Sequence, residues 1–391
     1  MILYGKNELF KKMMGDSEEN IYSLLEFAEK YGIKGNLVKA KIAWLIMKDE
    51  NPFSLSVERN DSHGSAEEFA RKDLAELCHK FFIEPQEEIL ENYTPTKQQI
   101  SGEEKRIGGL IERFVKALDI TPNEEEFFNE VKAFYVTYGV GEFGLNKAFY
   151  MLDDGSLMPV SHIKNVSFDD IYGYDSQKEK LIRNTCSFVE GGGANNVLLY
   201  GDSGTGKSTS IKAVLNMFYD QGIRMVQIQK HQFVHLSLLT EQLKKRNYRF
   251  VLYMDDLSFE DFEVEYKYLK AAIEGGLEEK PENVLIYATS NRRHLIKETF
   301  TEREGGDDIH RNESIQEKIS LSDRFGLSIF YPKPMQQEYF DIVEHLAERE
   351  GIDIENDLLI AEARKWGVSH GGYSGRTAAQ FIEQLKTEQN M

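Results

Sequence analysis

The sequence predicts an α/β domain with a parallel five-stranded sheet, preceded by a mostly helical N-terminal domain and followed by a small helical domain. Three observations lead to this prediction. Helix-capping patterns recur through the first 140 residues, and short apolar segments alternate with helical ones from Phe168 to Tyr331. After Pro332 and Pro334 the periodicity is helical.

Composition and charge exclude several classes of protein. The 391 residues suffice for two or three domains, and their apolar runs fall short of the ~18 residues that a membrane span needs. Between Met1 and Lys12 only the first four residues form an apolar run, which is too short for a secretory signal. We therefore expect a cytoplasmic location. A net charge of −19 argues against broad electrostatic attraction to nucleic acid or anionic lipid. Cys78 and Cys186 suggest neither a disulfide framework nor a metal site.

Residues 1–145 form the predicted helical domain, which we interpret as a recognition or assembly domain. Its helices are marked by capping boxes, in which an N-cap oxygen and an acidic side chain three residues later satisfy free backbone amides. The four predicted boxes are Asp16 with Glu19, Ser65 with Glu68, Ser101 with Glu104, and Thr121 with Glu124.

Residues 146–334 form the predicted α/β domain, which begins with a β-hairpin. Residues 147–160 place Asp154 and Gly155 between two apolar runs, the usual sign of a tight hairpin turn. Short apolar segments that alternate with helical ones are typical of a parallel sheet with helices on both faces. The predicted parallel strands are 196–200, 224–229, 249–254, 284–289 and 327–331. Residues 335–391, with helical segments 339–346, 358–366 and 377–385, form the predicted lid domain.

A phosphate-binding loop runs from Gly201 to Ser208. Its sequence GDSGTGKS follows the apolar strand NVLLY and opens a helix, which is the context that the P-loop pattern requires. Glycines allow the backbone amides to curl around phosphate oxygens, while Lys207 neutralises the β- and γ-phosphates and the Ser208 hydroxyl coordinates Mg²⁺. The predicted nucleotide-binding residues of this loop are Gly201, Asp202, Ser203, Gly204, Thr205, Gly206, Lys207, Ser208 and Thr209.

Two carboxylates follow the strand 250–254. In open α/β sheets, ligands bind at this carboxyl end of the strands. Asp255 is predicted to hold Mg²⁺, and Asp256 to orient or deprotonate the attacking water, although Asp256 could instead cap the next segment. The segment resembles a Walker B motif, which mostly has Glu at the second position. The resemblance implies that the shorter Asp256 affects the rate of hydrolysis more than nucleotide binding.

Several further motifs give the chain a specific resemblance. Phe168 to Gly173 (FDDIYG), Val284 to Arg293 (VLIYATSNRR), Ser322 to Gly326 (SDRFG) and Gly375 to Thr377 (GRT) stand in the order seen in AAA+ ATPases. Over about residues 145–390 the chain resembles a bacterial AAA+ family, domain of unknown function family 815.

This resemblance implies a set of roles. Asn291 would be sensor 1, Arg324 an arginine finger offered to a neighbouring subunit, and Arg376 sensor 2 in the lid. Ile171, Tyr172 and Gly173 would line the adenine pocket. A surface salt bridge is the alternative for each of the two arginines, and Arg292 and Arg293 could contact a partner or lie in a solvated turn. The implied cofactors are ATP and Mg²⁺. The implied assembly is a homo-oligomer, for which a ring is one arrangement.

The segment after the second strand differs from that of protein-threading AAA+ machines. They present an aromatic-apolar-Gly loop there, whereas residues 229–235 lead directly into a helix, so an unfoldase is disfavoured. His231 and His235 lack a third ligand for a metal site, and residues 301–312 are predicted to form a loop.

The leading hypothesis is an ATP hydrolase that remodels or positions an unknown protein partner. One alternative is a nucleotide-operated switch or scaffold with little turnover, which the shorter Asp256 favours. Another is a nucleic-acid-associated loader, supported by Arg292, Arg293 and the cluster at 244–246 but opposed by the acidic balance.

Overall fold

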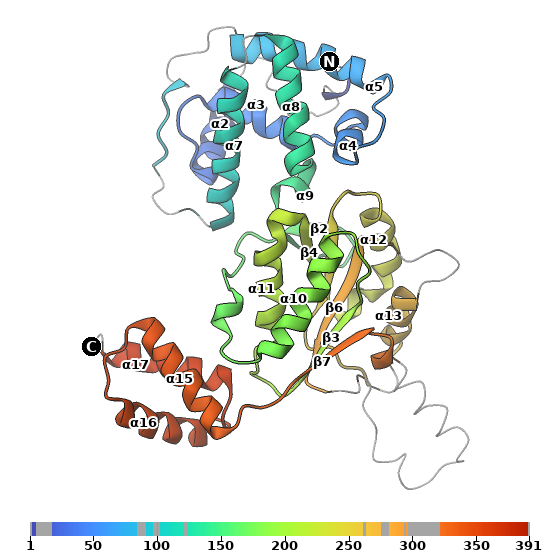
Figure 1. The fold of residues 1–391 in the computed structure, drawn as a ribbon. Helices are drawn as coiled ribbons and strands as arrows, with labels where there is room; N and C mark the ends of the chain where they lie inside the picture. The colour runs from blue at the N-terminus through green and yellow to red at the C-terminus, as the bar shows by residue number, and fades with distance from the viewer. Residues whose placement is uncertain are drawn as a thin grey trace. The chain divides into compact units, whose positions relative to one another are not determined.

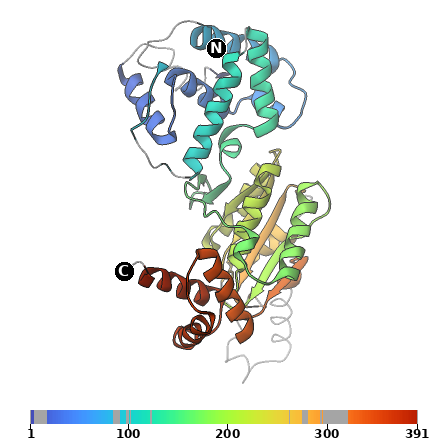
Figure 2. The same ribbon diagram turned by 60° about the vertical axis from the view of Figure 1, so that its left-hand side comes forward.

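The computed structural model describes residues 2–4, 18–83, 91–96, 100, 102–120, 123–260, 263–274, 281–292, 295 and 321–389. The chain forms two compact units, residues 1–149 with 159–163, and residues 150–158 with 164–391. The first unit is helical, and the second combines a sheet, flanking helices and a C-terminal helical lid (Figures 1 and 2). No helix in the described ranges is long and apolar enough to cross a membrane.

The helical unit packs around one apolar core. Apolar residues recur at helical spacing, so that each helix buries one face, as Phe127, Phe128 and Val131 do on α8. The described helices are α2 (Glu18–Tyr31), α3 (Leu37–Lys48), α4 (Pro52–Glu58), α5 (Ala66–Cys78), the π-helix η2 (His79–Ile83), α7 (Gly102–Ile120), α8 (Glu124–Tyr138) and α9 (Gly141–Leu145).

The helix starts differ in part from the predicted capping boxes. Ser65 is the N-cap of α5, but its side chain makes no capping hydrogen bond. Helix α8 begins at Glu124 with Asn123 as N-cap, whose side chain accepts from the backbone amide of Glu126. The prediction with Thr121 as cap therefore placed this start too early, because Asn123 is an equally good capping residue closer to the apolar run. Asp16, Ser101 and Thr121 lie outside the described residues.

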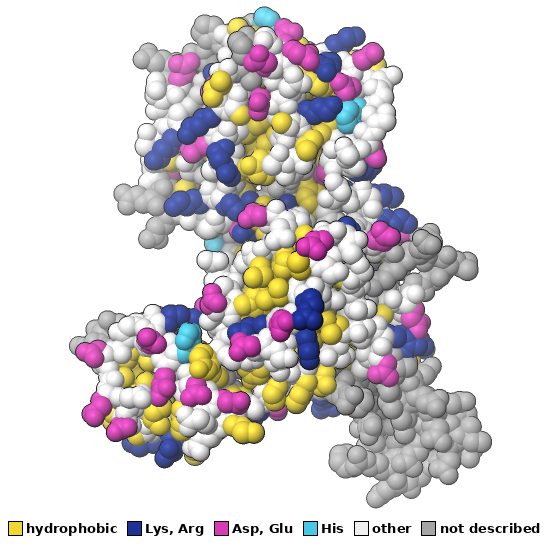
Figure 3. Space-filling model, in the orientation of Figure 1, with side chains coloured by type: hydrophobic (Ala, Val, Ile, Leu, Met, Phe, Trp, Pro, Cys, Tyr) yellow, Lys and Arg dark blue, Asp and Glu magenta, His cyan; other side chains and the backbone are white. Residues whose placement is uncertain are grey.

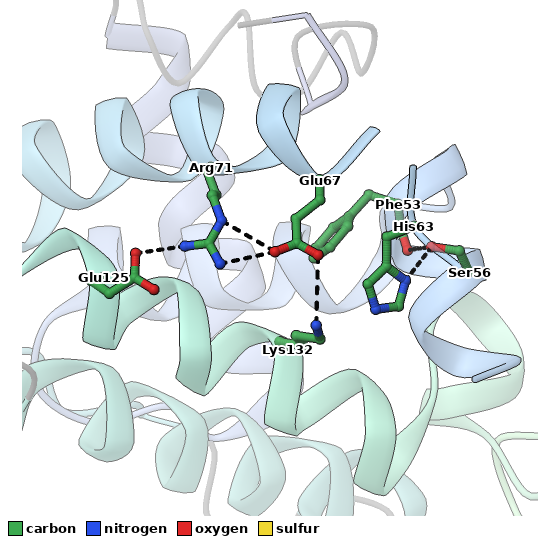
Figure 4. A network of polar contacts seen from close by, with 7 residues as sticks. All are labelled: Phe53, Ser56, His63, Glu67, Arg71, Glu125 and Lys132. Carbon is green, nitrogen blue, oxygen red and sulfur yellow. Dashed lines mark hydrogen bonds and ion pairs between the residues drawn. The ribbon is translucent and has the colours of Figure 1, made fainter. Parts of the chain in front are cut away.

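An ion-pair network joins α5 to α8 in this unit (Figure 4). Arg71 donates to Glu67 one turn earlier on α5 (2.9 Å) and to Glu125 on α8 (2.5 Å). Lys132 lies 3.7 Å from Glu67, and the Arg71 guanidinium lies 3.9 Å from the ring centroid of Phe128. These contacts connect two neighbouring helices and leave no free charge in the network, so we assign them a structural role.

The five predicted parallel strands are confirmed, within a larger sheet. The strands of the described chain are β1 (Ala148–Met151), β2 (Leu157–Pro159), β3 (Val197–Gly201), β4 (Ile223–Gln227), β5 (Arg249–Met254), β6 (Val284–Ser290) and β7 (Leu327–Tyr331). Their order in the sheet is β2-β1-β4-β5-β6-β3-β7, and the pairs among β3 to β7 are parallel. The prediction of a five-stranded sheet is thus wrong in its count, because the hairpin extends the sheet beside β4.

Helices flank the sheet and then form the lid. Helices α10 and α11 lie on one face and α12 and α13 on the other (Figures 1 and 2). They are α10 (Asp175–Val189), α11 (Lys207–Phe218), α12 (Leu236–Leu243) and α13 (Glu265–Glu274), with 3₁₀ turns η3 (Phe168–Asp170), η4 (Tyr219–Gln221) and η5 (Lys230–His235). The lid contains α15 (Gln336–Glu350), α16 (Asn356–Ser369) and α17 (Gly375–Gln389) around its own apolar core.

Strand order determines where the polar loops meet. Strand β3 lies between β6 and β7, and β5 is the other neighbour of β6. Since parallel strands end at the same edge, the segments that follow β3, β5 and β6 converge there.

Candidate nucleotide site

The backbone of the loop between β3 and α11 favours glycine, most clearly at Gly201 and Gly206. Gly201 has φ 134°, and a Cβ there would lie 2.1 Å from the carbonyl oxygen of Tyr331. Gly206 has φ 91° and is the N-cap of α11, which begins at Lys207. Both backbones lie in a region that residues with a Cβ rarely adopt. The loop therefore leads into a helix N-terminus, where backbone amides and the helix dipole favour an anion.

Lys207 is a buried cation surrounded by oxygen atoms. Its side chain is 6% exposed, and Nζ donates to the carbonyl oxygens of Gly201 (2.8 Å) and Asp202 (2.6 Å) and to Oδ1 of Asn291 (3.2 Å). Burial lowers the pKa of Lys207, and the carboxylates of Asp202 and Asp256 oppose that shift. An anion bound at the loop would favour the charged ammonium in the same way.

Ser208, Asp255 and Thr289 are connected by hydrogen bonds through one carboxylate oxygen. Oδ1 of Asp255 accepts from the hydroxyls of Ser208 (2.7 Å) and Thr289 (2.6 Å). Burial acts to raise the pKa of Asp255, but these hydrogen bonds outweigh it, so the pKa lies below its usual value. Asp255 is therefore ionised at neutral pH.

Asp256 is held on both its backbone and its side chain. Its amide donates to Thr289 Oγ1 (2.9 Å), and its Oδ1 accepts from the Asn291 side-chain amide (2.7 Å). Its φ of 53° is left-handed, a conformation that Asp tolerates better than most residues but that still needs support from its surroundings. Thr289 and Asn291 provide that support.

Ser208 and Asp255 fit a magnesium ion. Mg²⁺ prefers hard oxygen ligands, and adjacent ligands of an octahedral ion with bonds of about 2.0–2.1 Å lie ~2.9 Å apart. Ser208 Oγ and Asp255 Oδ1 are 2.7 Å apart. In the described ranges no cluster of three or more His, Cys, Asp or Glu could hold a metal, so this site would rely on further oxygens from nucleotide and water.

The loop forms one wall of a cleft with a volume of about 740 Å³, within the range usual for small-molecule sites. Ser203 to Thr209, Asp255, Asp256, Asn291 and Arg376 line it. Gly201 and Asp202 do not; their carbonyls face Lys207 instead. The cleft thus contains Lys207 and Asn291 together with both acidic residues.

The lid supplies a second wall of the cleft. The backbone amide of Arg376, at the start of α17, donates to the carbonyl of Gly204 (3.2 Å). A Cβ on Gly204 would lie 3.1 Å from Cβ of Arg376 and 2.9 Å from the Ser374 hydroxyl, so the lid contacts the loop closely. Arg376 therefore lies beside the predicted phosphate site.

The segment predicted to bind adenine lies partly in the cleft. Ile171 and Tyr172 line it, whereas Gly173, with φ 71°, does not. Ile171 packs against the loop, since a Cβ on Gly206 would lie 3.2 Å from its Cγ2. Tyr174, which we did not predict, lines the cleft and stacks on Tyr331 at 5.2 Å between ring centroids.

Arg324 lies outside the cleft and forms an ion pair with Glu274 of α13. Arg292 follows β6, and its amide donates to the Ser290 hydroxyl (3.2 Å). Arg293 and residues 301–312 lie outside the described residues. The sequence motifs therefore converge on one cleft, with the predicted finger away from it.

His231 and His235 contact the hairpin turn. His231 Nε2 lies 2.9 Å from Oδ1 of Asp153, and His235 Nε2 lies 3.0 Å from the carbonyl oxygen of Asp153. These contacts attach the segment after β4 to the hairpin turn.

The sequence analysis missed several residues that line the cleft or order it. Thr289 was identified as a strand end, but its link between the carboxylate of Asp255 and the backbone amide of Asp256 was not predicted; its place two residues before Asn291 was the available signal. Apart from Asp170, which stands in the FDDIYG motif, the other missed residues belong to segments distant in sequence and carry no local motif. They are Lys164, Asn165, Val166, Asp170, Ile342, Leu346, Arg349 and Ala379.

The fold and the site define a class of protein. A P-loop strand between two parallel neighbours, carboxylates after β5, Asn291 after β6 and a helical lid bearing Arg376 are features of an AAA+ nucleotide-binding fold. The chain belongs to the family described as Protein of unknown function (DUF815), which matches residues 145–389.

Comparisons with other proteins give little more. None of the curated proteins matches the chain significantly. Among solved structures, a Thermotoga maritima RuvB described as a Holliday junction branch migration motor is 18% identical, with a TM-score of 0.38, over 59% of this chain and 66% of that one. Another RuvB structure, of a mutant, is 17% identical, with a TM-score of 0.39, over 58% and 66%. The chain thus covers less than two thirds of these RuvB chains.

Proposed function

We propose that this protein hydrolyses ATP with Mg²⁺ and uses the nucleotide cycle to remodel or position a macromolecular partner. One observation carries the proposal: a continuous path of hydrogen bonds runs from Lys207 through Asn291, Asp256, Thr289 and Asp255 to Ser208. This path joins the segments after β3, β5 and β6 at one edge of the sheet. A structural turn alone would not require all of these groups.

The residues divide the chemistry among them. Lys207 neutralises phosphate charge, and Ser208 and Asp255 would hold Mg²⁺, which when bound stabilises charge on the phosphates. Asp256 orients the attacking water and accepts its proton, with Asn291 fixing the carboxylate. Arg376 brings a guanidinium from the lid to the cleft.

Substitution of Asp256 by Asn tests the hydrolysis step. Asp256→Asn should keep ATP binding and lose turnover by about 10²-fold or more, because an amide cannot accept the proton of the water. Calorimetry with Mg²⁺-ATP and phosphate release measure the two quantities, and Asp256→Glu serves as the matched control that keeps a carboxylate. Equal turnover in wild type and Asp256→Asn would reduce Asp256 to a capping residue and favour a different base.

A nucleotide-operated switch with little turnover is the second candidate function. The side chain of Asp256 is one methylene shorter than the Glu of most related motifs, and Asn291 already engages its Oδ1. The same experiment decides: tight Mg²⁺-ATP binding with no measurable phosphate release in wild type would establish the switch.

We also propose that Arg324 acts on the nucleotide of a neighbouring subunit in a homo-oligomer. It lies outside its own cleft, and an arginine supplied from outside can be worth ~10³-fold or more in rate. Such a head-to-tail contact closes into a ring when the rotation permits.

Mixing two inactive variants tests this arrangement. Lys207→Ala subunits should not bind ATP, and Arg324→Ala subunits should bind it without offering a finger. A mixture should recover activity that neither shows alone, as measured by phosphate release at several protein concentrations. If the mixture stays inactive while wild type turns over as a monomer by light scattering, Arg324 acts within its own subunit or only through Glu274.

We assign partner recognition to the helical N-terminal domain, residues 1–145, because the contacts of its described residues are those of an apolar core and of ion pairs between helices. A nucleic-acid partner is not favoured, since acidic side chains gather over the lid helices (Figure 3, lower left). Capture of partners with an Asp256→Asn protein held in the ATP state would identify the macromolecule.

A further inference from the structure

The lid contacts the core at a second place besides the phosphate loop. Arg349 of α15 donates from Nη1 to Oδ1 of Asp170 at 2.7 Å, and both residues line the cleft. Asp170 is itself fixed, because its other oxygen accepts from the backbone amide of Ser167 at 2.6 Å. The guanidinium therefore meets a carboxylate that the core already holds in place.

A second contact lies beside the first. The ring of His345, also on α15, lies 5.0 Å from the ring of Tyr172 between centroids, and Tyr172 lines the cleft. Residues four apart share a helix face, so His345 and Arg349 reach the core together. The core residues they meet are two positions apart in one segment.

The apolar core of the lid connects these contacts of α15 to the start of α17, which contacts the phosphate loop. Tyr339 and Val343 of α15 pack in one apolar cluster with Phe381 of α17. The start of α17 holds the loop through the amide of Arg376 and the carbonyl of Gly204. Movement of α15 away from the core would therefore carry Arg376 with it.

We propose that Arg349 and His345 form a latch with Asp170 and Tyr172 that holds the lid over bound nucleotide and sets the rate of ADP release. This inference rests on the proposed nucleotide function. Arg349 and His345 are positioning residues: they hold the lid against Asp170 and Tyr172, which line the cleft, and keep Arg376 beside the phosphates. Opening of the latch is the step that frees the product.

The dissociation rate of a fluorescent ADP analogue from the full chain, measured by chasing with unlabelled ADP, tests the latch. Arg349→Ala should release it about two- to fivefold faster, the range for a half-exposed ion pair. His345→Ala should release it about two- to tenfold faster, since an aromatic contact is lost. Arg349→Lys and His345→Phe keep the charge and the ring, so their rates should stay near that of wild type.

Two controls separate a latch from a general loss of structure. Lys365→Ala removes an exposed ion pair with Glu362 within α16, and its release rate should equal that of wild type. Heat unfolding without nucleotide should be unchanged in Arg349→Ala. Raising the salt concentration should narrow the gap between wild type and Arg349→Ala but not that between wild type and His345→Ala, because salt screens the ion pair.

The outcomes distinguish a failure of the proposed latch from a failure of the proposed nucleotide function. Wild-type release rates in both Arg349→Ala and His345→Ala, with normal ADP binding, would overturn the latch and leave the nucleotide function standing. If wild type shows no saturable ADP binding, or if Lys207→Ala binds as well as wild type, the nucleotide function falls and the latch falls with it. Faster release with rescue by Arg349→Lys and His345→Phe would support the latch.

Discussion

Two buried lysines, one in each unit, show what makes a buried charge useful. Lys41 in the helical unit is 7% exposed and Lys207 in the cleft is 6% exposed. Burial lowers the pKa of both ammonium groups. Judged by burial alone, the two positions would be equivalent.

Their surroundings differ. Lys41 Nζ lies 4.6 Å from the ring centroids of both Phe27 and Trp44, and the nearby ammonium of Lys48 adds to the lowering of its pKa, to about 8. Lys207 faces carbonyl and amide oxygens, and carboxylates oppose the lowering of its pKa. A buried cation thus becomes part of a site when oxygen acceptors fix its position and leave room for an anion; one held between rings contributes to packing.

The largest expected effect is on ATP binding, and it tests the comparison of the two lysines directly. Lys207→Met should weaken ATP binding by about 30-fold or more, which corresponds to the ~2–5 kcal/mol lost when one partner of a buried charge pair is truncated. Lys41→Met, the matched removal of a buried ammonium, should leave ATP affinity unchanged. Calorimetry with Mg²⁺-ATP on both variants measures this. Equal weakening in the two would show that the loss reflects stability rather than phosphate binding.

The stability of the helical unit should depend on pH through Lys41. Its pKa is about 8 in the folded chain against a usual 10.5. Below pH 8 both states carry the proton, and the cost of burying the charge is fully present. As pH rises from 8 to 10.5 the folded state loses the proton first, so the free energy of unfolding should increase, on the order of 2–3 kcal/mol.

Denaturation followed by Trp44 fluorescence, in a Trp366→Phe background, measures this increase. The quantity of interest is the stability of wild type relative to Lys41→Met at each pH, since other groups then cancel. A difference that stays flat from pH 7 to 10.5 would mean that Lys41 keeps its proton in the folded state.

The smallest expected effect is on Mg²⁺ affinity, and it tests whether Thr289 belongs to the oxygen-rich site around Lys207. Thr289→Val removes the hydroxyl that donates to Asp255 and accepts from the amide of Asp256. Substitution of residues that orient metal ligands typically lowers metal affinity by about 10–100-fold. The Mg²⁺ affinity in the presence of ATP should therefore fall about tenfold. Thr289→Ser keeps the hydroxyl and should behave like wild type. Unchanged Mg²⁺ dependence of turnover in Thr289→Val would remove Thr289 from the site.

Much of the phosphate side could be predicted because its signals are local. Gly201, Gly206 and Lys207 stand within one short loop, and their spacing reflects backbone angles and a helix start that seven residues can specify. The carboxylates after β5 were predicted because ligands bind at the carboxyl end of parallel strands, whereas the role of Asn291 after β6 was implied by the family resemblance. The hairpin was also visible in sequence, but its pairing beside β4 was not, since edge pairing depends on which neighbour is exposed.

By itself, the sequence determined the loop and the strands that frame it, since these rest on residue types at fixed short spacings. Tertiary structure decided which groups close the site: Thr289 as a bridge between Asp255 and Asp256, and Arg349 of the lid against Asp170. Arg349 and Asp170 are separated by 179 positions in the chain. No local pattern records such a contact, because it depends on how the lid helices pack and where that packing places one helix face against the core.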